Sequence, residues 1–150
     1  MPFEHRQRVR FHQSDPAGVL FFGRVFELVQ ATYEDLCRTA GIDIDGLMRQ
    51  STHTTPVIHA EADYRRAIRV GEEVVVRAEI ERLGTTSITL LYNVVGLDGE
   101  SRATVRVVHV FVDADTWRKV AIPADVRNRL VPFATSTEAA PSTGAREPSG

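Results

Sequence analysis

The residue of this chain best suited to catalysis is an aspartate in a tight turn just ahead of a long amphipathic helix. Asp15 begins the sequence Asp15-Pro16-Ala17-Gly18 (residues 15–18, the acid turn), in which Pro16 fixes φ and Gly18 tolerates a positive φ. A helix is predicted from Phe22, so free backbone N–H groups and the positive end of its dipole lie near the carboxylate. An Asp-Pro turn alone is more often structural, because its side chain bonds nearby amides. The juxtaposition with the helix is why we expect the chemistry here.

The helix that follows the acid turn is predicted over residues 22–40. Its apolar residues recur at i, i+3, i+4 and i+7, which describes one broad stripe: Phe22, Val25, Phe26, Val29, Tyr33, Leu36, Cys37 and Ala40. The opposite face is polar and charged. Gly41 supplies a stop signal, because glycine readily takes the left-handed conformation after a helix. Cys37 belongs to the apolar stripe and has no charged neighbour, so it is expected in the core rather than as a nucleophile.

Period-two alternation dominates the chain from residue 55 onward, which is typical of strands. Strands are predicted over residues 5–11, 56–64, 73–83, 87–95, 103–112 and 117–122, and helical turns over 43–49 and 123–130. Gly84-Thr85 and Asp98-Gly99 are expected to close hairpins. The strand at 103–112 is apolar at nearly every position, which predicts a central strand covered on both sides.

One early helix followed by antiparallel strands predicts an α+β domain. A single amphipathic helix can bury its stripe only across one face of such a sheet, and a curved sheet wrapped around a central helix is the hotdog fold. Residues 1–133 are expected to form this domain. Residues 134–150 contain no apolar side chain larger than alanine, so they are expected to be a disordered tail.

Composition excludes several functional classes. The chain has 150 residues and a net charge of −2, which fits one domain and argues against nucleic-acid binding. The single cysteine, the lack of a twenty-residue apolar run and the lack of an apolar signal segment predict a cytoplasmic protein without a membrane span. Cysteine and histidine do not recur at metal-ligand spacing, and glycine-rich phosphate loops are missing, so no metal and no cofactor are expected.

The segment from Asp15 to Phe22, followed by the helix, resembles the signature of the 4-hydroxybenzoyl-CoA thioesterase branch of the hotdog superfamily. The resemblance continues through residues 56–73 and along the strands to about Pro123. Residues 56–71 are similar to 1,4-dihydroxy-2-naphthoyl-CoA thioesterases. Many relatives carry proline where this chain has Ala67, a difference that affects the geometry of a loop and not the reaction.

The resemblance implies a thioesterase that hydrolyses an aromatic acyl-CoA, such as 1,4-dihydroxy-2-naphthoyl-CoA or 4-hydroxybenzoyl-CoA, to the free acid and CoA. Asp15 is then the catalytic carboxylate, which either attacks the carbonyl carbon to form an anhydride or activates a water. The backbone amide of Phe22 occupies the position that polarises the thioester oxygen. Such proteins form dimers through an edge strand, with the active site between subunits, and a dimer of dimers (a homotetramer) is common. Residues 56–64 are the expected pairing edge.

Candidate substrate-binding residues come from three further places. His59 is predicted on a strand face, where it either lines the acyl pocket or is structural. Two short basic groups could neutralise the phosphates of CoA by charge-assisted hydrogen bonds: Arg65, Arg66 and Arg69, and then Arg118 and Lys119. Basic groups of this size are also common on solvated surfaces.

Two other functions fit the sequence. The first is a thioesterase for a chain bound to a carrier protein, whose acidic surface would suit the same arginines. The second is a non-catalytic hotdog protein that binds acyl-CoA, but a binder has no need of an acid beside a polarised carbonyl. A hotdog dehydratase would need a histidine on the helix, and residues 22–40 contain none.

Overall fold

The structure is a computed structural model that describes residues 2–50 and 52–135. Its elements, in chain order, are β1 (Phe3–Arg8), η1 (Phe11–Gln13), η2 (Phe22–Arg24), α1 (Val25–Thr39), α2 (Ile44–Gln50), β2 (His53–Thr54), β3 (Val57–Tyr64), β4 (Glu73–Leu83), β5 (Ser87–Gly96), β6 (Ser101–Val110), β7 (Val112–Asp113), α3 (Ala124–Leu130) and η3 (Val131–Phe133). None of the helices in the described part of the chain is long and apolar enough to cross a membrane.

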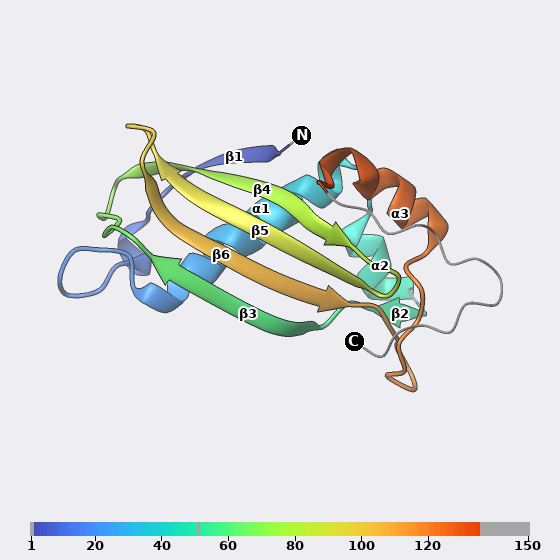
Figure 1. Ribbon diagram of the computed structural model, residues 1–150. Coiled ribbons are helices and arrows are strands. Elements are labelled where there is room, and N and C mark those ends of the chain that lie inside the picture. The colour runs from blue at the N-terminus through green and yellow to red at the C-terminus, as the bar shows by residue number, and fades with distance from the viewer. Residues whose placement is uncertain (1, 51, 136–150) are drawn as a thin grey trace.

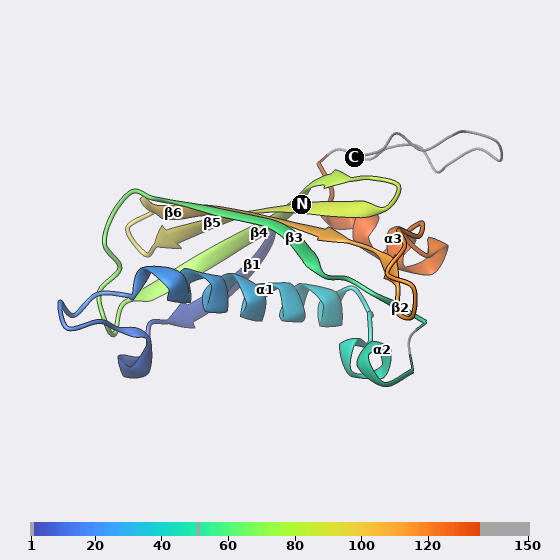
Figure 2. The ribbon, with the colours of Figure 1, turned by 90° about the horizontal axis from the view of Figure 1, so that it is seen from below.

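Five antiparallel strands form one sheet in the order β1-β4-β5-β6-β3 (Figure 1). Helix α1 lies across one face of this sheet, with its start near the end of β3 and its end near the start of β3 (Figure 2). The α+β hotdog arrangement predicted from the sequence is therefore confirmed. Short elements (α2, β2, β7 and α3) gather at the end of the sheet where α1 ends.

The core lies between α1 and the inner face of β4 and β5. The alternation predicted for β4 is confirmed, because Val74, Val76, Ala78 and Ile80 are all fully buried. Fully buried residues of β5 continue this layer. On α1, the buried stripe includes two residues that the predicted stripe left out: Leu28 and Thr32. The side chain of Phe22 is 65% exposed, contrary to its predicted place in the stripe, because residues 22–24 form a 3-10 turn ahead of α1.

Three strand predictions need correction. The first strand ends at Arg8, and Phe11 is instead exposed in a helical turn stabilised by the Gln13 side chain, which accepts a hydrogen bond from the Arg10 amide. Strand β6 alternates between buried and half-exposed residues, so the described chain covers only one of its faces. Residues 117–122 contribute a single bridge, from Lys119 to Val112, because β7 takes β2 as its partner.

Strand β3 forms one edge of the sheet. It pairs with β6 on one side, and no other strand of the described chain pairs with its second side. Three large side chains on β3 are about half exposed: Val57, Ile58 and Tyr64. This exposed fraction is unusually high for large apolar residues. An edge of this length with apolar side chains is a template for pairing with another chain.

Only the first two residues of the predicted tail are described. The amide of Thr135 donates to the carbonyl of Ile80 at 2.9 Å, and Ala134 forms a bridge with the same residue, so the chain follows β4 here. The rest of the predicted tail, residues 136–150, lies outside the described residues.

Candidate active site

The acid turn has the geometry that its sequence predicts. The amide of Gly18 donates to the carbonyl of Asp15 at 3.0 Å, and Gly18 takes a φ of 78°, which a residue with a side chain adopts only with strain. The half-buried Asp15 carboxylate accepts the Ala17 amide at 2.8 Å through Oδ1. Among the residues that the structure describes, none donates to Oδ2. Oδ1 thus stabilises the turn, and Oδ2 accepts no hydrogen bond from the described residues.

Hydrogen bonds to the segment before β4 fix the acid turn in place. The amide of Val70 donates to the carbonyl of Gly18 at 3.0 Å, and the amide of Leu20 donates to that of Ile68 at 2.7 Å. Ile68 is buried in the core. The acid turn is thus attached to the sheet and not only to the helix.

Gln13 joins the acid turn to the start of α1, a role that its sequence position did not suggest. It is buried, its carbonyl accepts the amide of Phe21, and its side-chain amide donates to the Glu27 carboxylate at 3.1 Å. The hydrogen bond from Gln13 lowers the pKa of Glu27, and Arg24 adds to this shift. The contact holds the acid turn against the first turn of the helix.

The Phe22 amide opens the helical segment and carries an unused N–H. It is the first amide of η2, and no described residue accepts its hydrogen. The hydroxyl of Tyr64, at the end of β3, donates to the Phe22 carbonyl. Tyr64 was not among the predicted site residues, because on sequence it is one more residue of an alternating strand. It attaches the edge strand to the start of the helical segment.

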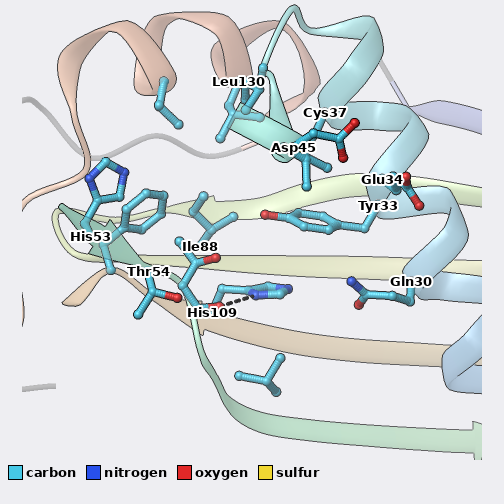
Figure 3. Close-up of a pocket in the computed structure, with 16 residues that line it drawn as sticks. Gln30, Tyr33, Glu34, Cys37, Asp45, His53, Thr54, Ile88, His109 and Leu130 are labelled. Atoms are coloured by element: carbon cyan, nitrogen blue, oxygen red, sulfur yellow. Dashed lines mark hydrogen bonds between the residues drawn. The ribbon is translucent and has the colours of Figure 1, made fainter. Parts of the chain in front are cut away.

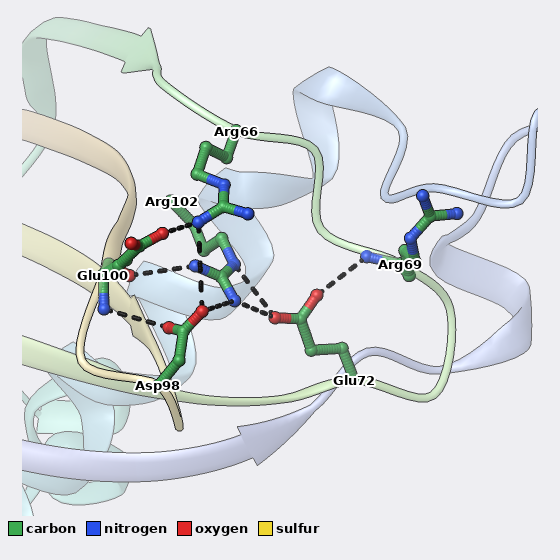
Figure 4. A network of polar contacts seen from close by, with 6 residues as sticks. All are labelled: Arg66, Arg69, Glu72, Asp98, Glu100 and Arg102. Atoms are coloured by element: carbon green, nitrogen blue, oxygen red, sulfur yellow. Dashed lines mark hydrogen bonds and ion pairs between the residues drawn. The ribbon is translucent and has the colours of Figure 1, made fainter.

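Only one of the three arginines at 65, 66 and 69 lies beside the acid turn. Arg69 forms a backbone bridge with Val19, and Figure 4 shows its guanidinium pointing away from the neighbouring ion pairs. Arg66 pairs with Glu100, so its charge is neutralised within the chain. Arg65 lines a shallow hollow with Arg106 on the outer face of the sheet.

The ion pairs next to Arg69 fix the segment that carries it. Arg102, with a side chain only 9% exposed, donates to Asp98 at 3.1 Å and to Glu72 at 2.8–2.9 Å (Figure 4). The second oxygen of Glu72 accepts the backbone amide of Arg69 at 3.0 Å. Hydrogen bonds to Asp98 and Glu72 raise the pKa of Arg102. The network is structural, and it orders the backbone beside the acid turn.

The remaining predicted binding residues lie elsewhere. His59 is exposed on β3, with its Nε2 3.8 Å from Glu61, and it does not line the main cavity. Arg118 and Lys119 are exposed in the turn after β7, which pairs with β2 at the far end of the molecule. The structure therefore places Asp15, the Phe22 amide and Arg69 on adjoining segments, pairs Arg66 within the neighbouring ion-pair network, and leaves the other four residues elsewhere.

A cavity of about 440 Å³ lies at the end of α1 (Figure 3). Its interior is mostly apolar and includes Cys37, Ile88 and Phe111. Gln30 and Glu34, both exposed, line it on the α1 side. Sequence reasoning did not find this cavity, because its walls come from three helices (α1, α2 and α3) and four strands (β2, β3, β5 and β6) that are far apart in the chain.

Asp15 does not line this cavity in its own chain. Helix α1 separates the two: Val25 to Cys37 spans twelve residues, which at the rise of an α-helix is about 18 Å. Asp15 and the Phe22 amide thus lie near the start of the helix, and a mostly apolar cavity lies at its end.

Comparisons with known proteins agree with this architecture. A family model described as the thioesterase-like superfamily matches residues 9–130. A 1,4-dihydroxy-2-naphthoyl-CoA hydrolase from Nostoc punctiforme is 25% identical over 148 residues, which cover 98% of this chain and 99% of that protein. An enzyme of the same name from Synechococcus sp. (strain CC9605) is 29% identical over 128 residues, covering 82% and 85%.

Solved structures show the same fold. A 1,4-dihydroxy-2-naphthoyl-CoA thioesterase from Synechocystis superposes with a TM-score of 0.83 at 17% identity, covering 87% of this chain and 96% of that one. The family model extends over most of the chain, from before the acid turn to the end of α3. The chain therefore belongs to the thioesterase-like superfamily of hotdog proteins and is a thioester hydrolase.

Proposed function

We propose that this protein hydrolyses an aromatic acyl-CoA at a site shared between two copies of the chain. The observation that carries the proposal is the separation of the two halves of the site along α1. Asp15, the Phe22 amide and Arg69 lie at its start, and the acyl-sized cavity lies at its end. Neither half is sufficient alone, because hydrolysis needs both an acid and a place for the acyl group.

Pairing through β3 would complete the site. Antiparallel pairing of two β3 strands follows a two-fold axis that exchanges the ends of the two molecules. Helix α1 runs alongside β3 in the opposite direction (Figure 2), so the axis brings the start of one α1 towards the end of its mate. The acid turn of one copy would then face the cavity of the other.

The reaction in this arrangement is a hydrolysis of the thioester bond. The Phe22 N–H polarises the carbonyl oxygen, supported by the helix dipole. The Asp15 carboxylate either attacks the carbonyl carbon, giving an anhydride that water hydrolyses, or removes a proton from an attacking water. In both routes the carbon–sulfur bond breaks, the acyl group gains a hydroxyl from water, and the sulfur leaves as the CoA thiol after taking a proton.

The nucleotide of CoA would lie along the same interface. Arg69 of one copy and Arg118 and Lys119 of the other are at ends that the two-fold axis brings together, and each could pair with phosphate. The named relatives act on 1,4-dihydroxy-2-naphthoyl-CoA, which supports a bicyclic aromatic acyl group, with 4-hydroxybenzoyl-CoA as the smaller alternative. Membership of the 4-hydroxybenzoyl branch, assembly into a homotetramer and a cytoplasmic location remain predictions.

Replacing the carboxylate tests the proposal. Asp15→Asn keeps the size of the side chain and its hydrogen bond from Ala17, but it removes the base or nucleophile, so turnover of 1,4-dihydroxy-2-naphthoyl-CoA should fall about 100-fold or more. Release of the CoA thiol measures turnover, and circular dichroism checks the fold. Asp115→Asn, at an exposed turn, is the matched control and should match the wild type. An Asp15→Asn protein as active as the wild type would show that Asp15 is not catalytic.

A further inference from the structure

A buried histidine lines the cavity that the proposed function assigns to the acyl group. His109, near the end of β6, is only 4% exposed. Its ring stacks on that of Tyr33 from α1, with centroids 4.7 Å apart and planes 14° from parallel (Figure 3). This contact between helix and sheet leaves the imidazole little freedom to rotate. The sequence did not single out His109, because it is one of several polar residues in an alternating strand.

The hydrogen bond that His109 makes determines which of its nitrogens carries the proton. Nδ1 lies 3.2 Å from the carbonyl oxygen of Thr55. A carbonyl oxygen can only accept, so Nδ1 must donate. Burial lowers the pKa of His109, although the bond to Thr55 opposes this, and the ring is therefore neutral near pH 7. In the neutral ring with a proton on Nδ1, Nε2 is an acceptor.

Nε2 has no partner among the described residues. Figure 3 shows this nitrogen turned away from Thr55, towards the side of the cavity where Gln30 lies, and no hydrogen bond joins the two side chains. The cavity thus holds an oriented, uncharged hydrogen-bond acceptor. A ligand that donates a hydrogen bond to this nitrogen is favoured. A ligand that displaces water from the nitrogen without donating a hydrogen bond is disfavoured.

We infer that Nε2 of His109 is the specificity-determining acceptor of the acyl pocket, and that it selects aromatic acyl groups that carry a hydroxyl group. The inference rests on the proposed function and adds to it the residue that recognises the substrate. A hydroxylated ring would donate to Nε2 while its faces contact the apolar walls of the cavity. An unhydroxylated ring of the same size would leave Nε2 dry and unpaired, and sites built around such a hydrogen bond reject analogues that lack it.

The experiment compares matched substrates on the full-length protein. kcat/KM is measured for benzoyl-CoA and its 2-, 3- and 4-hydroxy derivatives, and for 2-naphthoyl-CoA and its 1,4-dihydroxy derivative. The wild type should prefer at least one hydroxylated member over its parent by about tenfold or more. His109→Phe keeps an aromatic ring on Tyr33 but has no acceptor, so this preference should fall to near one. His109→Gln, which restores an acceptor, should recover part of it.

The outcomes separate the two proposals. The effect of a hydroxyl group on the intrinsic reactivity of the thioester is the same for wild type and variant, so the change in the ratio isolates the contact with His109. Hydrolysis of the parent substrates with no preference for any hydroxylated one, or a preference unchanged in His109→Phe, would overturn the role of His109 and leave the proposed function standing. Failure to hydrolyse any aroyl-CoA would overturn the proposed function itself. If His109→Phe does not fold, His109→Leu, which also lacks an acceptor, replaces it in the comparison with the wild type.

Discussion

Cys37 and Asp15 lie at opposite ends of one helical segment, and their surroundings give them different chemistry. Cys37 is buried on the inner face of α1, and burial raises the pKa of its thiol to about 11, although a hydrogen bond with Tyr33 opposes this. A thiol with such a pKa is a poor nucleophile near neutral pH. Asp15 is half-buried, with one carboxylate oxygen unpartnered among the described residues. Of these two groups, we propose the acid as the one that attacks.

The cysteine should therefore be almost unreactive in the folded protein. An increase in pKa from 9.0 to about 11 favours the protonated thiol, so the thiolate fraction at pH 8 falls by about 100-fold. Because Cys37 is the only cysteine, reaction with a chromogenic disulfide at pH 8 reports on it alone. We expect at least this slowing relative to the protein in urea. Equal rates in both conditions would show that the thiol is exposed.

Individual site residues could be predicted only where local sequence determines their role. Asp15 was found because proline and glycine define its turn. His109, Tyr64 and Gln13 were not, because each acts on residues remote in the sequence: Tyr64 donates to a carbonyl 42 positions away. His59 lies on the exposed edge strand β3 and does not line the cavity of its own chain, so its binding role stays a prediction. Alternation predicts on which face of the sheet a strand residue lies. It does not predict which residues from elsewhere in the chain pack against that face.

At the scale of elements, α1 covers one side of the core, and the two parts of the proposed site lie near its two ends. Its buried stripe packs on β4 and β1, and the cavity lies at its end, where residues of α2 and α3 join those of the sheet. Elements with a strong local pattern, such as β4 and α1, were predicted within a few residues. The strand predicted at 117–122 was wrong, because β7 pairs with β2 instead. Strand β2 has two residues and lies about 60 positions before β7, so no periodicity in the sequence predicts this pairing.

Two leucine substitutions should separate packing by α1 from surface effects. Leu36 is fully buried on α1, so Leu36→Ala removes apolar contacts and leaves a cavity, which should lower the free energy of unfolding by about 3 kcal/mol. Leu97 is 59% exposed in the β5–β6 turn, and Leu97→Ala should change it by less than about 0.5 kcal/mol. Urea denaturation measures both. Similar losses in the two variants would show that α1 does not hold the core as described.

For the whole molecule, the proposed dimer would explain both the exposed edge of β3 and the separation of Asp15 from the cavity. Val57 and Ile58 are half exposed on an edge whose second side no described strand covers. Pairing of two such edges would bury them and bring each acid turn to the cavity of its mate. Details of this assembly could not be predicted from one sequence, because the proposed partner is a second copy of the chain and its only signal is an apolar edge strand.

A heterodimer with a different defect in each chain tests this account most directly. Asp15→Asn removes the acid of one chain, and Thr54→Trp fills the cavity of the other from an exposed position on β2. Each variant alone should be nearly inactive. Two affinity tags isolate the mixed dimer, in which one site would combine the intact acid of one chain with the intact cavity of the other, and about half of the wild-type turnover should return. A mixed dimer as inactive as its parents would contradict a site shared between the subunits.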